Sequence, residues 1–205
     1  MLRNICYIYW QRGRKHMPPK ARITKKMILH TVLKITRESG FDSVNARRIA
    51  EELGCSTRPV FTCYENMEEL KREFLGYAFS YYEQYTTENE KNAKTDPCLL
   101  HPLSYVSFAG EEANLFKILF INDMDLNMKK PDDFYMESGN EKKAAIFAEK
   151  VGVDQENAKK IFLDLFFYSH GIAVLTATGK LSLDRKSTEK MLSTFLEARI
   201  GQKEA

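Results

Sequence analysis

The sequence lacks an acidic residue before Glu38 and lacks a long uninterrupted apolar run. No apolar stretch approaches the roughly 18 residues that a membrane-spanning helix requires, so we expect no transmembrane segment. The opening apolar patch, ICYIYW, is only six residues long, and most of the nearby basic residues follow it, unlike a secretory signal. The sequence therefore predicts a cytoplasmic protein without a membrane partner.

Arrangements typical of metal sites and of catalysis are also missing from the sequence. The four cysteines form no CxxC pair and have no zinc-finger spacing; they are Cys6, Cys55, Cys63 and Cys98. We expect the second and third of these to be buried as small apolar residues. No Ser/His/Asp order and no Gly-rich phosphate loop is present, and the adjacent Glu111 and Glu112 point in different directions on a helix. We therefore predict no disulfide, metal, cofactor or enzyme activity.

Charge is present but unevenly distributed. The whole chain has a net charge of +3, yet residues 1–66 contain 13 lysines and arginines against 5 acidic residues, a net charge of +8. The remaining residues contain 18 basic against 23 acidic residues, a net charge of −5. Such asymmetry predicts that the N-terminal part meets a polyanion. A solvated basic arm without a partner would show the same distribution.

Apolar periodicity predicts an all-α protein. The segment ITKKMILHTVLKITRESGF places Ile28, Val32 and Ile35 on one helical face, with Thr24 as the N-cap and Gly40 as the stop. No alternating pattern typical of a strand is present. We therefore expect one long helix at the start of the periodic sequence.

A second and a third predicted helix follow closely. The second lies between its N-cap Asn45 and Gly54, with apolar residues spaced along one face: Ala46, Ile49, Ala50 and Leu53. After a short turn, Ser56 or Thr57 caps the third helix, which tolerates Pro59 in its first turn because no N–H partner is needed there. Two short helices joined by a turn with a glycine are typical of a helix-turn-helix.

The rest of the chain predicts a larger helical bundle. A fourth helix of about twenty residues is capped by Asn66 and fades in the polar sequence TTENEKNAKTD. Two short segments lie on either side of Gly110, and residues 124–140 read as a loop with Pro131 and Gly139. Three more helices are expected over residues 141–152, 154–178 and 184–199.

Residues 24–70 resemble the TetR family of bacterial transcriptional regulators. The resemblance is carried by GFDSV, RRIAEELGCS and VFTCYENMEEL, with an Ile-Ala pair, a glycine before the turn, an aromatic-x-x-aromatic run and an acidic-Leu helix start. It implies an N-terminal extension over 1–19, a helix-turn-helix DNA-binding domain over 20–66, and a helical effector-binding and dimerisation domain over 67–205. It also implies a homodimeric repressor that binds a palindromic double-stranded DNA operator and is released by a small-molecule effector.

Two positions depart from the family pattern. Phe61 stands where a tyrosine hydroxyl usually meets a phosphate, and Met67 stands where a lysine usually begins the fourth helix. Both departures remove a phosphate contact, and such contacts supply much of the affinity for DNA. Backbone N–H groups at the start of the fourth helix can still hold a phosphate. We expect DNA binding that is weaker or depends more on the basic arm.

The resemblance assigns DNA-contacting residues to this sequence. Arg58, at the start of the recognition helix, can contact guanine O6 and N7 in a bidentate manner. Tyr64 either reaches a phosphate or packs in the core, and Arg47 either meets the backbone or is solvated. Lys20, Arg22, Lys25 and Lys26 form an arm for phosphates or the minor groove, or a solvated face. The predicted DNA contacts are Lys25, Asn45, Arg47, Thr57, Arg58, Phe61, Thr62, Tyr64 and Met67.

The segment before Met17 has two interpretations. Either Met17 is the natural start, or the apolar ICYIYW forms an ordered element that packs on the body. The mass of the native protein separates the two interpretations.

The C-terminal half is rich in aromatic residues and methionine. Collectively these side chains can line an apolar cavity for an effector, although each can also be ordinary core. For His170 the alternative is a structural histidine with satisfied hydrogen bonds. The predicted ligand-binding residues are Phe108, Phe116, Phe120, Met124, Phe147, Phe166, Phe167 and His170.

Pairing of the last two helices with a second copy would form a four-helix interface, as the resemblance implies. A ligand that favours one spacing of the recognition helices would then change DNA affinity, with the fourth helix as the lever. One rival interpretation is a ligand-binding or interaction bundle with a vestigial DNA module, which Phe61 and Met67 favour. Another rival is a helical enzyme that uses the aromatic cavity.

Overall fold

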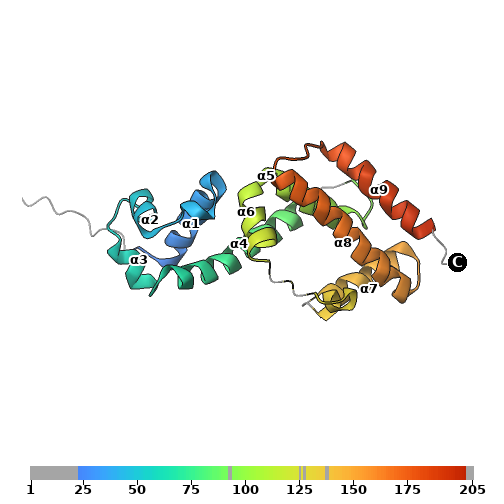
Figure 1. Ribbon diagram of the computed structural model, residues 1–205, viewed down its shortest axis with the longest axis horizontal. Coiled ribbons are helices and arrows are strands. Elements are labelled where there is room, and N and C mark those ends of the chain that lie inside the picture. Colours follow the sequence, from blue (N-terminus) through green and yellow to red (C-terminus); the bar gives the residue numbers. More distant parts are fainter. Residues whose placement is uncertain (1–22, 92–93, 125, 127, 137–138, 202–205) are drawn as a thin grey trace, which may run out of the picture.

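The structure, a computed structural model, describes residues 23–91, 94–124, 126, 128–136 and 139–201. Within these residues every regular element is a helix, which confirms the all-α prediction. The α-helices are α1 (Lys25–Ser39), α2 (Ala46–Glu52), α3 (Arg58–Cys63), α4 (Met67–Lys91), α5 (Leu100–Glu111), α6 (Ala113–Lys117), α7 (Asn140–Val151), α8 (Gln155–Ala177) and α9 (Arg185–Gly201). Figure 1 shows an elongated molecule in which α1, α2 and α3 form one end and α4 leads to the bundle at the other. The N-terminal extension, Met17, Lys20 and Arg22 lie outside the described residues.

Local capping signals set the ends of α1 and α2, as predicted. The Thr24 side chain accepts a hydrogen bond from the Met27 backbone N–H at 3.2 Å. Gly40 ends α1 with a φ of 79°, a left-handed conformation that favours glycine. The Asn45 side chain accepts from the Arg48 N–H at 3.0 Å and begins α2.

The start of α3 differs from the prediction in one respect. Thr57 occupies the N-cap position, but its side chain makes no capping hydrogen bond. Its backbone has helical angles, φ −70° and ψ −16°, whereas a capping side chain needs an extended backbone. Pro59 lies in the first turn of α3, as expected.

Helix α4 is longer than expected, because it continues through the polar stretch to Lys91 over 25 residues. Asn66 caps it as predicted, since its side chain accepts from the Glu69 N–H at 2.9 Å. Near the other end, Thr86 is buried against the bundle, and Gln84 donates to Glu88 one turn later at 2.8 Å. Burial of one face and a pair at i,i+4 spacing stabilise a helix whose exposed face is polar.

The interruption expected around Gly110 falls instead at Glu112. Gly110 lies inside α5, and an added Cβ there would lie 3.5 Å from the Thr176 methyl group of α8, an ordinary contact distance. Glu112 leaves the helix with φ −123° and ψ 45°, and α6 begins after it and continues as the π-helix η3 (Ile118–Asn122). The predicted loop over 124–140 also contains a short 3-10 helix, η4 (Pro131–Met136).

Helix α8 is the central helix of the bundle. It contacts α5, α7 and α9, and its N-cap Asp154 accepts from the Asn157 N–H at 3.0 Å. By length and composition alone, α8 is long and apolar enough to cross a membrane. Its polar residues interrupt the apolar run, so the sequence pattern did not predict this. Ile172 and Ala173 are buried against neighbouring helices, which is typical of the core helix of a bundle.

Helix α4 contributes to both ends of the molecule. Near its start, Phe74 is fully buried in the N-terminal core and stacks on Phe41 with ring centroids 5.4 Å apart. Two turns later, Tyr82 packs edge-on against Phe108 of α5 at 5.0 Å. The predicted domain boundary at residues 66 and 67 therefore coincides with the start of a helix that both parts share, and the division into domains stays a prediction.

Candidate nucleic-acid interface

Helices α2 and α3 are anchored on the N-terminal core by their apolar residues. Ile49 of α2 is 0% exposed and Val60 of α3 is 1% exposed. Gly54 forms the turn between the two helices with a φ of 61°, which a residue with a Cβ rarely adopts. The opposite faces of α2 and α3 are left in solvent.

Four of the predicted DNA contacts lie on these solvent-facing sides. Arg47 of α2 and Arg58, the first residue of α3, are exposed. Phe61 is 52% exposed one turn after Arg58, although it is aromatic. Thr62 is exposed too, and its hydroxyl donates to the Arg58 carbonyl oxygen at 2.9 Å. Among the described residues, neither arginine has an acidic partner within ion-pair distance, so both can bind an anion.

Asn45 and Thr57, two other predicted contacts, occupy the N-cap positions of α2 and α3. The Asn45 side chain is the acceptor that caps α2, so its oxygen is engaged in the free protein. Thr57 is half-buried immediately before α3. Because the Thr57 side chain does not cap α3, the backbone N–H groups at the start of that helix can face a phosphate.

The structure corrects the prediction that Tyr64 contacts DNA. Tyr64 is 1% exposed, so it packs in the core, which was the alternative interpretation of this residue. Burial raises the pKa of its hydroxyl, because the charged form is disfavoured away from water. As the residue that follows α3, it holds the end of that helix against α1 and α4 and cannot reach a phosphate.

Lys25 is exposed but engaged with α4. Its Nζ lies 2.7 Å from a Glu73 carboxylate oxygen and 4.0 Å from Glu69, and it sits over the Tyr64 ring at 4.6 Å. The hydrogen bond with Glu73 raises the pKa of Lys25. Lys25 therefore links the start of α1 to α4, and binding a phosphate would require it to leave these carboxylates.

The start of α4 is unfavourable for a phosphate. Met67 is half-buried and brings no charge, while Glu68 and Glu69 place two carboxylates in the first helical turn. The side chain of Asn66 already occupies the Glu69 N–H. The two carboxylates would repel a phosphate at close range. They therefore oppose the predicted binding of a phosphate by backbone N–H groups at this helix start.

The predicted effector residues mostly form one aromatic cluster. Phe108 and Phe116 are fully buried, and Phe120 is half-buried between them. The Phe120 ring lies 5.2 Å from Phe116 and 4.9 Å from Tyr82, and Tyr105 lies 5.1 Å from it. Rings at these distances attract one another beyond the area they bury.

His170 is the polar group within this cluster. Its Nδ1 lies 2.8 Å from the hydroxyl oxygen of Tyr105, and its ring stacks on Phe166 with centroids 5.6 Å apart. Burial lowers the pKa of His170, which favours the neutral ring. A neutral imidazole beside a phenol can exchange hydrogen-bond donor and acceptor roles with a ligand.

The remaining predicted effector residues are more dispersed. Phe147 is buried on α7 beside Phe162, with centroids 5.5 Å apart, and Met124 is half-buried after η3. Phe167 is 49% exposed, so its assignment to an internal cavity is wrong. Adjacent residues point about 100° apart around a helix, so Phe166 faces inward and Phe167 faces outward.

Sequence reasoning missed several central residues. Tyr82 and Tyr105 are buried in the middle of the cluster, and Glu112 is a buried carboxylate between two helices. The apolar spacing of Ala78 and Tyr82, four residues apart, was the signal for the first. The signal for Glu112 was a pair of acidic residues, Glu111 and Glu112, between two apolar segments.

The described architecture, a short helix-turn-helix unit followed by a helical bundle, defines a class of fold. A solved structure with this fold is a TetR-like transcriptional regulator from Rhodococcus sp. RHA1. The two align with a TM-score of 0.60 and 12% sequence identity over 87% of this chain and 96% of that chain. The chain therefore has the fold of a TetR-like transcriptional regulator. No family model matches the chain, and a search of curated proteins finds no relative.

Proposed function

We propose that this protein is a cytoplasmic DNA-binding transcriptional regulator, a homodimeric repressor that binds a palindromic operator and releases it when a small-molecule effector binds. The observation that carries the proposal is Arg58, which is exposed at the first residue of α3 while Val60 anchors the same helix in the core. A guanidinium carried at the exposed start of a helix that is anchored in the core is suited to bidentate contact with guanine. The likeness to a TetR-like regulator supports the same function.

A stripe on the outer face of α8 supports the homodimer. Phe167 is 49% exposed and Leu175 is 47% exposed, and exposed Gly171 lies between them at i,i+4 spacing. An added Cβ at Gly171 would meet nothing within 4 Å, so a second helix can approach closely there. Two recognition helices must reach major grooves about 34–36 Å apart, and the proposed dimer through α8 and α9 would have to hold them at that spacing.

The aromatic cluster supports the effector. Its rings, with the Tyr105–His170 pair as the polar element, have the composition of a ligand pocket, mostly apolar with few polar groups. An aromatic or apolar compound with one hydrogen-bonding group fits that chemistry. Binding would act on DNA only through a difference in affinity between two arrangements of the protein.

Selection of genomic DNA fragments on the purified protein, followed by sequencing of the retained fragments, tests the proposed function. A shared palindromic site that Arg58→Ala fails to retain supports it, and the neighbouring genes then indicate the effector. Retention of unrelated fragments, equal for the wild type and the variant, contradicts sequence-specific reading. Competing salt in the wash provides the control for non-specific retention.

A second candidate function is a ligand-binding or interaction bundle that no longer reads DNA. Glu68 and Glu69 at the start of α4, together with Met67, favour it, because they oppose a phosphate at that position. The two functions separate in a salt titration: a regulator loses affinity for a specific fragment steeply with salt, and an interaction bundle retains no fragment at low salt.

A further inference from the structure

Glu112 is the one charged residue among the buried side chains of the described chain, with 8% exposure. It lies at the break between α5 and α6, where its N–H donates to the Phe108 carbonyl and its carbonyl accepts from the Phe116 N–H, each at 2.8 Å. Both contacts hold the backbone of Glu112 in place at the break. A buried carboxylate is costly unless it is paired and hydrogen-bonded.

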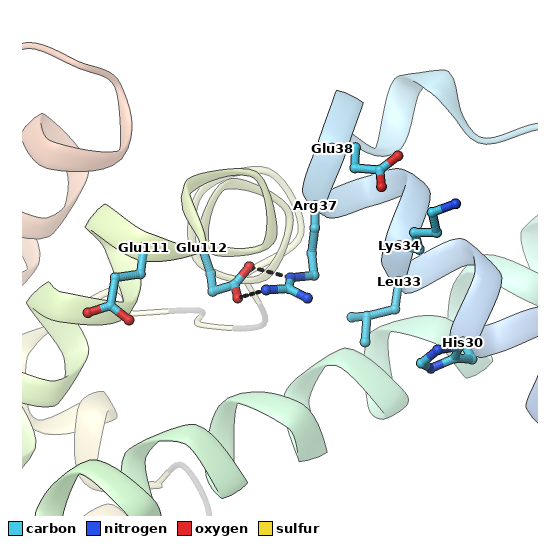
Figure 2. Close-up of a pocket in the computed structure, with 7 residues that line it drawn as sticks. All are labelled: His30, Leu33, Lys34, Arg37, Glu38, Glu111 and Glu112. Carbon is cyan, nitrogen blue, oxygen red and sulfur yellow. Dashed lines mark hydrogen bonds and ion pairs between the residues drawn. The ribbon is translucent and has the colours of Figure 1, made fainter.

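The partner of Glu112 comes from the other end of the molecule. Arg37, in the last turn of α1, donates from Nε to one carboxylate oxygen at 2.7 Å and from an Nη to the other at 2.5 Å. Figure 2 shows both bonds between the two side chains, whereas Glu111 points away from them. A bidentate guanidinium–carboxylate pair has a defined orientation as well as strength.

Three further contacts surround this pair. The hydroxyl of Tyr81, from α4, donates to Glu112 at 2.9 Å, and the Arg37 guanidinium lies over the Tyr81 ring at 5.6 Å. Asn114 of α6 donates its side-chain N–H to the Arg37 carbonyl oxygen at 3.0 Å. At the end of α1, Glu112 therefore binds the side chain of Arg37, and Asn114 binds its backbone carbonyl.

An open pocket of about 360 Å³ lies beside this junction. One wall is the face of α1 between positions 30 and 38, and the other wall is Glu111 and Glu112 (Figure 2). Because the pocket separates α1 from Glu111 at the end of α5, the two helices do not pack closely on that side, while α1 contacts α6 and α4 elsewhere. The polar contacts of Arg37 carry that part of the connection.

Helix α6 also reaches the aromatic cluster. Phe116, four residues after Glu112, is fully buried, and its ring lies 6.4 Å from His170 and 5.2 Å from Tyr105. A short helix thus connects the cluster to the end of α1, whose other end supports α3 through the core. A shift of α6 must either carry α1 with it or break the pairing of a buried charge.

We propose that the Arg37–Glu112 pair, with Tyr81 and Asn114, is the element that couples the aromatic cluster to the orientation of the helix-turn-helix unit. This inference rests on the proposed function, and Arg37 and Glu112 are positioning residues in it. The coupling free energy between two sites is reciprocal. Operator binding at α3 therefore changes the structure around α6 through this pair.

Amide hydrogen exchange on the full chain tests the proposal, with the retained operator fragment as the probe. In the wild type, operator binding changes exchange in α6, and Glu112→Gln abolishes that change while the overall fold is kept. The matched control is Glu52→Gln, which breaks the Lys34–Glu52 pair at 2.6 Å between α1 and α2, one turn before Arg37 and within the N-terminal unit. The control keeps the response of α6.

The free protein provides an independent readout. Without DNA, Glu112→Gln accelerates exchange by about tenfold in the last turn of α1 as well as in α6, because a contact between the two parts is lost. Acceleration confined to α6 overturns the proposal, and so does a response of α6 to operator that persists in Glu112→Gln. A wild type that binds operator without any change in α6 overturns it as well.

Failure to fold and failure of the proposed function are both distinguishable. If Glu112→Gln unfolds, Tyr81→Phe replaces it, since it removes one donor and keeps the ring; a smaller effect in the same direction supports the proposal and a wild-type response contradicts it. If no fragment is retained by the wild type, the proposed function fails. In that case, amide exchange of the wild type and of Glu112→Gln without DNA still tests the coupling between α1 and α6.

Discussion

Tyr168 of α8 stacks face to face on Phe195 of α9, with ring centroids 4.3 Å apart and planes 7° apart. The stack fixes α9 against one side of α8. On the outer side, Phe167 and Leu175 stay exposed along the same helix. The two helices together present a rigid surface with apolar side chains, which is what a second copy needs for a four-helix interface.

The proposed dimer is tested by Phe167→Glu. A carboxylate in the centre of an apolar interface loses its hydration without gaining a partner, so we expect the dissociation constant of the dimer to rise by about a hundredfold or more, roughly 3 kcal/mol. Light scattering after size exclusion measures the change in mass with concentration. Ile146→Glu on α7, where the side chain is 44% exposed, is the matched control and should leave the dimer intact. A dimer unaffected by Phe167→Glu would place the interface elsewhere.

Arg58→Ala tests direct reading of a base. We expect a loss of about 1–3 kcal/mol in binding to the selected operator, and less discrimination at one base pair. Arg58→Lys should not restore the discrimination, because an ammonium cannot make the bidentate contact. Fluorescence anisotropy with the operator and single-base variants measures both quantities. Arg185→Ala, an exposed arginine of α9, is the control. Equal losses on every DNA sequence would indicate a phosphate contact instead.

Met67→Lys tests the contribution of the start of α4. A lysine there adds a cation opposite a phosphate, so affinity for operator should rise and the slope of log affinity against log salt should steepen by about 0.9. The free protein should lose a few tenths of a kcal/mol of stability, because a cation at a helix N-terminus opposes the helix dipole. Met67→Leu, which changes no charge, serves for comparison. An unchanged slope shows that α4 does not face the DNA backbone.

His170 predicts a pH dependence of stability. Because burial lowers the pKa of His170 in the folded state below its ordinary value of 6.5, the unfolded chain binds its proton first as the pH falls. Stability is therefore fully present above about pH 6.5 and is lost as the pH falls through that value toward the lowered folded-state pKa. His170→Gln should flatten this part of the profile. Denaturant unfolding of both proteins between pH 8 and 5 gives the difference; parallel profiles would contradict the assignment.

The starts of four helices were predictable because their capping signals are local. Thr24, Asn45, Asn66 and Asp154 each accept a hydrogen bond from a backbone N–H three residues later. The helix-turn-helix pattern is local too, since the apolar spacing in α2 and the glycine after it lie within ten residues. Interactions of this range depend on neighbouring residues alone, so the sequence determined the all-α class and the position of α3.

Packing decided the rest. Whether Tyr64 faces solvent or core, and whether Lys25 is free or engaged with Glu73, depends on how α4 lies against α1. The pair between Arg37 and Glu112 joins residues 75 positions apart, and no periodicity in either segment encodes it. Burial of a charge is a property of the surrounding elements rather than of the residue itself. The sequence alone thus determined which helices form, and the tertiary structure decided which of their polar groups face one another.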